Sequence, residues 1–326
     1  MKSIRFVITV AFLSIILFLS ISLLTLFQLS YREISTELST YVSNTLAERT
    51  SDQLINMVNL PVELNRVEAD AINLGLLDFN NAQKVNQYFW QNLRAYPILN
   101  AAFYANSNGD MFGSRHSPND DAVFEVMQSN YLKGGNLQYF STDSQGKPLS
   151  VVEQATNYDP RSRSWYTDAV QAGHTRWSPI YLDFATQALV ITAASPIYDV
   201  DGNLIGVIGS AFKFSEVHEY LQPLKIGKSG IIFLIERNGL LISTSTDDPF
   251  YKQTGNSIDR INAMDSQNTL IKTATAFINQ NYKGFGNIYD QEIFSFIISG
   301  KKYFGYVVPI TDPNGIDWLS VTIIPE

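Results

Sequence analysis

Residues 189–213 read LVITAASPIYDVDGNLIGVIGSAFK, and residues 303–324 read YFGYVVPITDPNGIDWLSVTII. Both stretches contain the pattern P-I-x-D-x-x-G between two apolar runs, and the pattern begins at Pro196 in the first and at Pro309 in the second. A polar turn between two apolar runs predicts an antiparallel hairpin. The chain therefore carries the same hairpin twice.

A second repeated feature lies upstream of each of these hairpins. Phe103 precedes the Asn-Gly pair at 108–109, and Phe233 precedes the Asn-Gly pair at 238–239 with the same spacing. Asn-Gly flanked by apolar residues is the strongest short-range signal of a tight hairpin. We therefore expect two similar modules in tandem, each opening with an Asn-Gly hairpin and closing with a longer one. The fold class that this predicts is α+β, with antiparallel sheets.

Length and composition agree with two modules and exclude several classes of protein. A chain of 326 residues suggests about two domains. A hydrophobic content of 45% with 17% charged residues excludes a disordered chain. Cysteine is absent, which excludes disulfides, thiolate zinc sites and cysteine nucleophiles. The formal net charge of −8 argues against nucleic acid as a partner.

An uncharged apolar segment, FVITVAFLSIILFLSISLLTLFQL, occupies residues 6–29. As a helix it would be about 36 Å long, which is enough to cross a bilayer. Lys2 and Arg5 precede it, so the positive-inside rule places residues 1–5 in the cytoplasm and the rest of the chain outside the plasma (inner) membrane. The alternative is a cleaved signal peptide, but the apolar stretch exceeds the usual length of about 7–15 residues and no small-x-small cleavage site follows it.

The segment after the membrane anchor has the pattern of a long helix over residues 30–78. Apolar residues recur in it at four-residue spacing: Ile34, Leu38, Val42 and Leu46. Residues 47–53 lack an apolar stripe, so we expect this turn to be solvated or loosely packed. Pro61 is expected to kink the helix or to end it. Such a helix is suited to a homodimer contact; the alternative is a helix laid along a domain for support.

The module boundary is expected near 215–230, where the helical pattern SEVHEYLQPL meets a turn at Gly227–Gly230. The Gly-Lys-Ser sequence in this turn is not a phosphate-binding loop, because that motif needs a glycine where Gln222 stands. The sequence thus predicts five parts: a cytoplasmic N-terminus (1–5), a transmembrane helix (6–29), a long extracytoplasmic helix (30–78), a membrane-distal module (79–220) and a membrane-proximal module (221–326).

Side chains suited to ligand binding gather between residues 158 and 183. The segment reads YDPRSRSWY from Tyr158 and is followed by Trp177, Tyr181 and Asp183. Arginine matches a carboxylate through two parallel hydrogen bonds, and aromatic rings form apolar walls or cages for an ammonium group. These residues are typical of a pocket for a small polar metabolite. The alternative is that the aromatic residues belong to the core and that Arg163 forms a structural ion pair with Asp159 or Asp183.

This combination of an N-terminal anchor, a long helix, a strand-rich tandem repeat and Y-D-P-R-x-R-x-W-Y resembles the double Cache (dCache) family. These are extracytoplasmic ligand-binding regions of bacterial chemoreceptors, sensor histidine kinases and cyclases. The resemblance covers residues 31–326, roughly. It implies two PAS-like modules stacked on the long helix, with the ligand held in the membrane-distal module and no cofactor, metal site or catalytic residue in this region.

The amino-acid-binding branch of that family has a motif that can be matched to this chain position by position. The resemblance implies that Arg163, Trp165 and Tyr166 hold the ligand carboxylate. It implies that Tyr158 and Tyr181 help to hold the amino group of the ligand. Asp183 matches an acidic neighbour of these residues.

One position departs from the motif. The branch carries an aspartate, which pairs with the ligand ammonium, on the strand after the closing hairpin, whereas this chain has Gly-Ser-Ala-Phe at residues 209–212. A missing charge-assisted hydrogen bond costs about 1.5–3 kcal/mol. Either Asp183 takes over the role, or the ligand is not an ordinary amino acid. An amino acid, another amine and a carboxylate all remain open.

Two other function classes remain as alternatives: a membrane-tethered exported enzyme, and a ligand-free dimerisation or interaction module. None of the common hydrolase motifs or paired-histidine metal motifs occurs. His116 lies in SRHSPND, which we expect to be an exposed loop. The resemblance also implies that such a sensor continues into a second transmembrane helix and a cytoplasmic output domain, so the chain is either part of a larger receptor or a sensor that signals through a partner.

Overall fold

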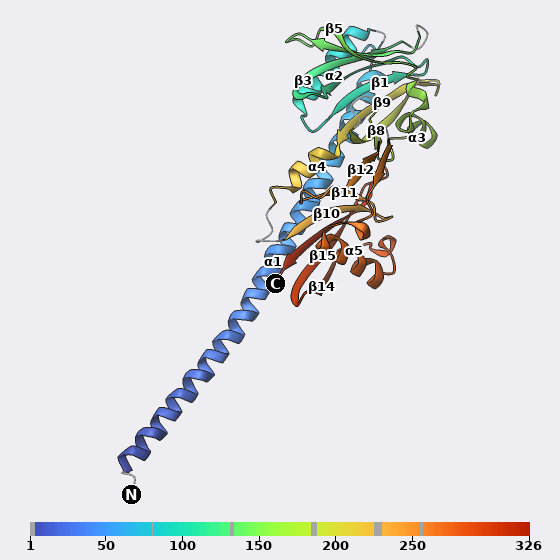
Figure 1. The fold of residues 1–326 in the computed structure, drawn as a ribbon. Coiled ribbons are helices and arrows are strands. Elements are labelled where there is room, and N and C mark those ends of the chain that lie inside the picture. Colours follow the sequence, from blue (N-terminus) through green and yellow to red (C-terminus); the bar gives the residue numbers. More distant parts are fainter. Residues whose placement is uncertain (1–3, 80, 131–133, 184–187, 225–229, 255–256) are drawn as a thin grey trace.

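A single long helix supports two β-sheet modules that lie one beyond the other along it (Figure 1). The structure is a computed structural model that describes residues 4–79, 81–130, 134–183, 188–224, 230–254 and 257–326. The turn expected at Gly227–Gly230 lies outside the described residues except for Gly230.

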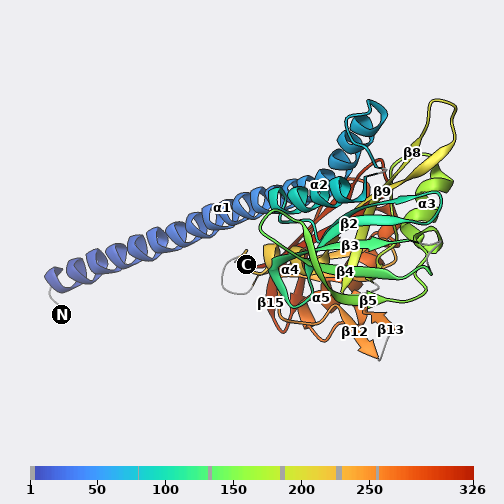
Figure 2. The same ribbon diagram turned by 90° about the horizontal axis from the view of Figure 1, so that it is seen from above.

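The long helix, α1, spans Ile4–Asn73 without interruption. Its apolar stretch, Ile8–Tyr31, has the length and composition of a membrane span and is not buried against the rest of the chain. Pro61 lies inside the helix and does not end it. Figure 2 shows the last part of α1 turned away from the line of the rest, as expected of a helix that contains proline.

The expectation that residues 47–53 are solvated or loosely packed was wrong for one face of this turn, although residues 48, 49, 52 and 53 are exposed. Ala47, Thr50 and Ser51 are almost completely buried, and α1 packs there against the proximal module. These small side chains make no apolar stripe, but they let the helix backbone approach the sheet closely. The helix therefore does lie along the modules as a support. The side chains of Ile34, Leu38 and Val42 are outside the described part of the structure.

The module that lies farther from the apolar stretch of α1 (Figure 1) keeps the name membrane-distal module as a label for its place along the helix, and the other module keeps the name membrane-proximal module. The distal module is built on a nine-stranded antiparallel sheet. Its helices and strands are α2 (Ala82–Ala95), β1 (Ala101–Asn106), β2 (Met111–Ser117), β3 (Asp120–Ser129), β4 (Leu137–Thr142), β5 (Pro148–Ala155), the 3-10 helix η2 (Pro160–Ser162), α3 (Ser164–Ala172), β6 (Arg176–Trp177), β7 (Tyr181–Leu182), β8 (Leu189–Tyr198) and β9 (Leu204–Lys213).

The membrane-proximal module is built on a five-stranded antiparallel sheet, with a separate pair of short strands beside it. The helix α4 (Phe214–Leu221) leads from the distal sheet to this module. The elements of the module itself are β10 (Ile231–Glu236), β11 (Leu241–Thr244), β12 (Tyr251–Thr254), β13 (Ser257–Arg260), η3 (Ala263–Asp265), α5 (Thr269–Asn281), η4 (Phe285–Asn287), β14 (Glu292–Ile298), β15 (Lys301–Thr311) and β16 (Asp317–Pro325).

The two sheets share the order of five neighbouring strands, β2-β1-β9-β8-β6 and β11-β10-β16-β15-β14, which confirms the repeat predicted from the sequence. The distal sheet runs β5-β4-β3-β2-β1-β9-β8-β6, and the proximal sheet runs β11-β10-β16-β15-β14. In both sheets the Asn-Gly hairpin and the closing hairpin join through an antiparallel pairing of the first strand with the last, β1 with β9 and β10 with β16. The α+β class with antiparallel sheets is likewise confirmed.

The aspartate of the P-I-x-D-x-x-G pattern explains why the turn recurs. The Asp199 carboxylate accepts hydrogen bonds from the backbone N–H groups of Asp201 and Asn203, at 3.0 and 2.8 Å. Asp312 does the same with Asn314 and Ile316, at 3.1 and 2.6 Å. An aspartate that bonds to the backbone two residues ahead fixes a turn locally. The same carboxylate chemistry therefore closes both modules.

The second copy of this turn also joins the two modules. The indole Nε1 of Trp177, in β6, donates to the Asp312 carboxylate at 2.9 Å. The backbone N–H of Trp177 donates to the carbonyl of Asn314 at 3.0 Å. The distal module is thus hydrogen-bonded to the closing turn of the proximal module through one tryptophan, which we call the Trp177 joint.

Asn65 clamps α1 to the distal sheet. It is completely buried, donates from Nδ2 to the carbonyl of Ala193 in β8 at 2.8 Å, and accepts from the hydroxyl of Ser210 in β9 at 2.7 Å. Because this one amide joins the helix to two adjacent strands, its loss leaves the Ala193 carbonyl and the Ser210 hydroxyl without this partner.

We expect Asn65→Ala to lower the free energy of unfolding by about 2–4 kcal/mol, since two buried hydrogen bonds are lost and their partners stay desolvated. Chemical denaturation of the whole chain in detergent micelles measures this. Asn281→Ala removes an exposed side-chain bond to the Phe277 carbonyl at a helix end and should change stability by less than about 0.5 kcal/mol. Equal effects of the two substitutions would contradict the clamp.

Candidate ligand-binding site

A cavity lies in the distal module between the sheet and the segment that precedes and begins α3. The side chains that matter most for its chemistry are Arg115, Tyr139, Tyr158, Arg163, Trp165, Tyr181 and Asp183. Apolar residues complete the wall, among them Phe103, Met111, Met127 and Leu137. The volume open to water-sized spheres is about 30 Å³, which is room for about two or three water molecules. The cavity is therefore narrow, and a metabolite can enter only if its walls move apart.

A local hydrogen-bond network shapes the segment that carries the motif. The Asp159 carboxylate accepts from the backbone N–H of Arg161 at 3.0 Å and so caps η2. Arg163 then stands at the N-cap of α3 in extended conformation. The change from extended chain to helix at this point places Arg163 and Trp165 at the cavity wall.

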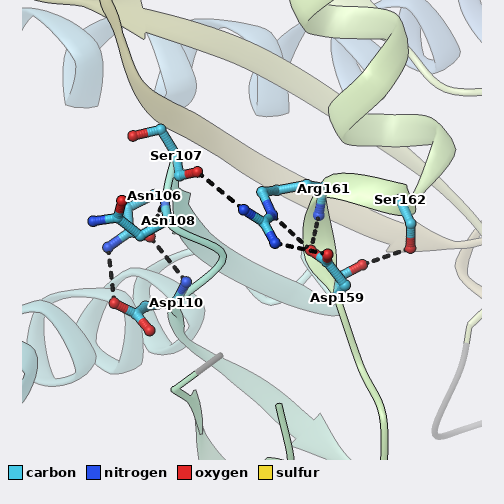
Figure 3. A network of polar contacts seen from close by, with 7 residues as sticks. All are labelled: Asn106, Ser107, Asn108, Asp110, Asp159, Arg161 and Ser162. Atoms are coloured by element: carbon cyan, nitrogen blue, oxygen red, sulfur yellow. Dashed lines mark hydrogen bonds and ion pairs between the residues drawn. The ribbon is translucent and has the colours of Figure 1, made fainter. Parts of the chain in front are cut away.

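The two arginines of the motif have different surroundings. The Arg161 guanidinium forms an ion pair with Asp159 at 2.9 Å and reaches the carbonyl of Ser107, just beyond β1, at 3.4 Å, as Figure 3 shows. Arg161 therefore ties the motif to the β1–β2 turn. Asp159 pairs with Arg161, whereas Arg163 lines the cavity with its guanidinium carbon 6.0 Å from the centre of the Tyr158 ring.

Five of the six residues that the motif indicated line this one cavity: Tyr158, Arg163, Trp165, Tyr181 and Asp183. Tyr166 is absent from the lining; it is buried and packs edge-on against Trp165, with ring centres 5.6 Å apart. Trp165 belongs to both readings of the sequence, because it is a buried core residue that also forms part of the wall. Trp177 lies in the core at the Trp177 joint instead.

The phenols in the wall are neutral hydrogen-bonding groups. Burial raises the pKa of Tyr158 and of Tyr181 above the usual value, and burial raises that of Tyr139 likewise. The Tyr181 hydroxyl is 2.7 Å from that of Thr192 in β8. These groups can orient a ligand through hydrogen bonds without adding charge to the cavity.

Sequence reasoning missed a buried charge cluster around Arg115. Its guanidinium lies 2.7 Å from the Glu125 carboxylate and also pairs with Glu153. The guanidinium carbon is 3.4 Å from the centre of the Tyr139 ring, a stacked arrangement that fixes its orientation. Its Nη1 atom is buried and has no hydrogen-bond partner among the described residues. Arg115 thus brings a second guanidinium to the cavity.

The register of the sheet assembles this cluster. Arg115 of β2 lies directly opposite Glu125 of β3, and Tyr139 of β4 lies opposite Glu153 of β5. Directly opposite residues share a face of the sheet. The sequence signal that could have indicated this cluster is a charged residue, Arg115, on an otherwise apolar strand face. Only the register of the sheet shows which carboxylates pair with this arginine.

The structure also describes residues 209–212, where the resemblance to the family implied an ammonium-binding aspartate that this chain lacks. Ala211 of β9 lines the cavity, and Ser210 points away from it toward Asn65. The methyl group of Ala211 offers no counter-charge. Asp183 is the one carboxylate among the described lining residues.

The expectation for His116 was wrong. It lies in β2, not in an exposed loop, and only 7% of it is exposed. The reason is that β2 continues past the apolar residues and pairs with β3 through His116 and Phe124.

The chain as a whole can now be compared with known proteins. The model of the dCache_1 family, a Cache domain, matches residues 27–326. The chain belongs to the double Cache family. The methyl-accepting chemotaxis protein PctB of Pseudomonas aeruginosa is 32% identical over 111 residues, which are 34% of this chain and 18% of PctB. The matched part of the chain thus covers less than a fifth of the length of PctB.

Solved structures with the same double Cache fold extend the likeness to most of the chain. The ligand-binding domain of the Campylobacter jejuni chemoreceptor Tlp3, in complex with 4-methylisoleucine, has a TM-score of 0.54 at 15% identity and covers 89% of this chain and 91% of its own. The Pseudomonas aeruginosa domain of PctC, in complex with GABA, has a TM-score of 0.54 at 16% identity and covers 88% of this chain and 99% of its own. At such identities the likeness shows the fold.

Proposed function

We propose that this chain is the extracytoplasmic sensing region of a bacterial transmembrane receptor and that it binds a small metabolite in the cavity of the distal module. The observation that carries the proposal is the convergence of Tyr158, Arg163, Trp165, Tyr181 and Asp183 on one cavity. The chemoreceptor domains of the same fold were solved with amino-acid ligands, so amino acids, amines and carboxylates are the ligand classes to consider first.

The charges in the wall narrow the choice among these classes. Arg163 supplies a planar pair of donors for a carboxylate, while Asp183 supplies an acceptor for an amine. Arg115 is already neutralised by Glu125 and Glu153, so it can donate a hydrogen bond but does not favour a second anionic group. A ligand with one carboxylate, and with an amine near Asp183 rather than near Ala211, fits best.

Binding must change the shape of the module, because the cavity is too narrow for such a metabolite. A ligand therefore favours a state in which the wall formed by the start of α3 has moved outward. From the end of α3 the chain runs through Gly173 into β6 and the Trp177 joint. A displacement of α3 would in this way reach the closing turn of the proximal module.

The membrane-bound arrangement rests on α1. Its apolar stretch, Ile8–Tyr31, is long enough to span a bilayer, and the same unbroken helix contacts both modules. Residues 79–220 would form the membrane-distal module and residues 221–326 the proximal one. We propose that two copies associate through α1, so that a shift of the modules along the helix changes the spacing or tilt of the membrane-spanning segments.

The test is a ligand screen on the whole chain in detergent micelles. A panel of amino acids, amines, purines and organic acids is added singly, and thermal unfolding is followed by tryptophan fluorescence. A ligand at about 100 times its dissociation constant stabilises by about 2.7 kcal/mol, which should raise the unfolding midpoint by about 5 °C.

Two outcomes would contradict the proposal. If no compound of the panel raises the midpoint at millimolar concentration, the ligand-free interaction module is the better description. If a compound that stabilises the protein is also converted, as product analysis would show, the exported enzyme is the better description.

A further inference from the structure

A second polar cavity lies on the opposite face of the distal sheet, where that sheet meets α4. It is lined by Asn100, His116, Asp121, Lys213, Glu216 and Glu219, with apolar residues around them. Its volume open to water-sized spheres is about 230 Å³, against about 30 Å³ for the cavity of the motif. It is thus much the roomier of the two.

Strand alternation places Asn100 and His116 together on this face. Arg115 and Ala101 lie opposite each other and line the cavity of the motif. Their neighbours His116 and Asn100 are joined by a backbone hydrogen bond of 2.9 Å. Since successive side chains in a strand point to opposite faces, His116 faces the second cavity. Asn100 directly precedes β1 and lines both cavities.

Both of these residues carry a buried acceptor without a donor. Asn100 and His116 are 5% and 7% exposed, and neither Asn100 Oδ1 nor His116 Nε2 has a hydrogen-bond partner within the described part of the chain. His116 Nδ1 lies against the carbonyl of Asp121 and must donate to it. Burial lowers the pKa of His116, so the ring is neutral near pH 7 and Nε2 is an acceptor.

The charges around this cavity favour a cation as its ligand. Asp121, Glu216 and Glu219 are acidic, and the one cation among the described lining residues, Lys213, already donates to Asp121 at 2.7 Å. Burial and the nearby charge of Glu219 raise the pKa of Glu216. The local charge is therefore about −2, and unpaired acceptors outnumber donors.

We propose that this second cavity binds a small primary ammonium cation, whose N–H groups donate to Asn100, His116 and the Glu216 carboxylate. A cation with several N–H donors satisfies the buried acceptors and the excess negative charge at once. A simple cation such as Na⁺ or tetramethylammonium offers charge but no N–H donor.

The second cavity lies where a bound cation would contact both the distal sheet and α4, the helix that leads to the proximal module. The backbone N–H of Asn100 donates to the carbonyl of Ala211, a wall residue of the motif cavity, at 2.8 Å. Glu216 and Glu219 lie on α4, whose His218 Nδ1 is 2.7 Å from the carbonyl of Thr244 in β11. A cation held between the sheet and α4 would fix the orientation of that helix against the distal module.

The experiment measures thermal unfolding of the whole chain in detergent micelles with methylammonium chloride, at constant ionic strength. Tetramethylammonium chloride and NaCl are the matched salts. Methylammonium should raise the midpoint by about 2 °C or more, and the matched salts should not. Glu216→Gln should weaken the apparent affinity about tenfold, because one charge-assisted hydrogen bond becomes a neutral one.

Two variants locate the effect. Arg163→Ala, in the motif cavity, should retain the response to methylammonium, as should Asp201→Asn, which removes one negative charge from an exposed turn. Each variant is measured without amine first, so that a loss of stability is recorded separately. If Arg163→Ala loses the response to methylammonium and Glu216→Gln retains it, the amine occupies the motif cavity and the proposal is overturned. An equal response to NaCl would mean counter-ion screening and would overturn it as well. The absence of any response to methylammonium would also overturn it.

Discussion

Replacing Arg163 with alanine should abolish stabilisation by any carboxylate-bearing ligand. The guanidinium would hold the ligand carboxylate through two charge-assisted hydrogen bonds in a buried cavity, and such bonds contribute about 1.5–3 kcal/mol each. The expected result is a loss of affinity of at least about 100-fold. Isothermal titration of the whole chain with the best compound of the screen measures it.

The motif itself supplies the control for this prediction. Arg161 stands two residues earlier and pairs with Asp159 outside the cavity lining, so Arg161→Ala should leave the affinity within about threefold, although it removes the same charge. Arg163→Lys keeps the charge but not the planar pair of donors, and it should recover little of the binding. Unchanged affinity in Arg163→Ala, with its unfolding midpoint intact, would remove this arginine from the ligand site.

Replacing Glu68 with glutamine should make the protein more stable at pH 8 and flatten its response to pH. Glu68 lies on α1, is 1% exposed and accepts a hydrogen bond from Asn92 Nδ2 of α2 at 2.6 Å. Burial raises the pKa of Glu68 to about 8, and its Oε2 atom has no partner among the described residues. The side chain is therefore uncharged in the folded protein at neutral pH.

The sign of the effect follows from the two pKa values. In the unfolded chain the carboxyl ionises near pH 4.5, whereas in the folded protein it keeps its proton up to about pH 8. The stability of the wild-type protein therefore falls as pH rises between these two values and changes no further above them. Glutamine does not ionise. The difference in the free energy of unfolding between Glu68→Gln and wild type should therefore grow by roughly 2–4 kcal/mol, in favour of the variant, as the pH rises from 5 to 8.

Unfolding of the whole chain at pH 5, 6, 7 and 8 tests this. Glu63→Gln is the matched control, because Glu63 lies on the same helix but is exposed and paired with Arg66; its pH profile should run parallel to that of wild type. Parallel profiles for wild type and Glu68→Gln would show that Glu68 ionises normally in the folded protein.

The features that the sequence predicted well are those fixed by local chemistry. The Asn-Gly pairs and the aspartates at 199 and 312 act on backbone groups within four residues, so the hairpins and their duplication could be read directly. The motif around Arg163 could be read for the same reason, since a 3-10 turn and the start of α3 place its members on one wall.

The features that were missed depend on contacts between distant segments. Arg115 meets Glu125 and Glu153 only through the register of four strands. Thr50 and Ser51 are buried although their own sequence gives no apolar signal, and the strands that α1 contacts in the proximal sheet, β15 and β16, follow much later in the chain. His116 faces a cavity because β2 continues through this polar segment as far as Ser117 and pairs there with β3.

The position of β16 has a consequence for how the chain matures. This strand holds the last regular residues of the sequence, Asp317–Pro325, yet it lies in the middle of its sheet between β10 and β15. The distal sheet has all its strands by Lys213, whereas the proximal sheet keeps two unpaired edges until β16 arrives. A chain delivered N-terminus first can therefore complete the distal sheet early, whereas the proximal sheet is completed last. Until then the edges of β10 and β15 stay open, and a chaperone would have to shield them.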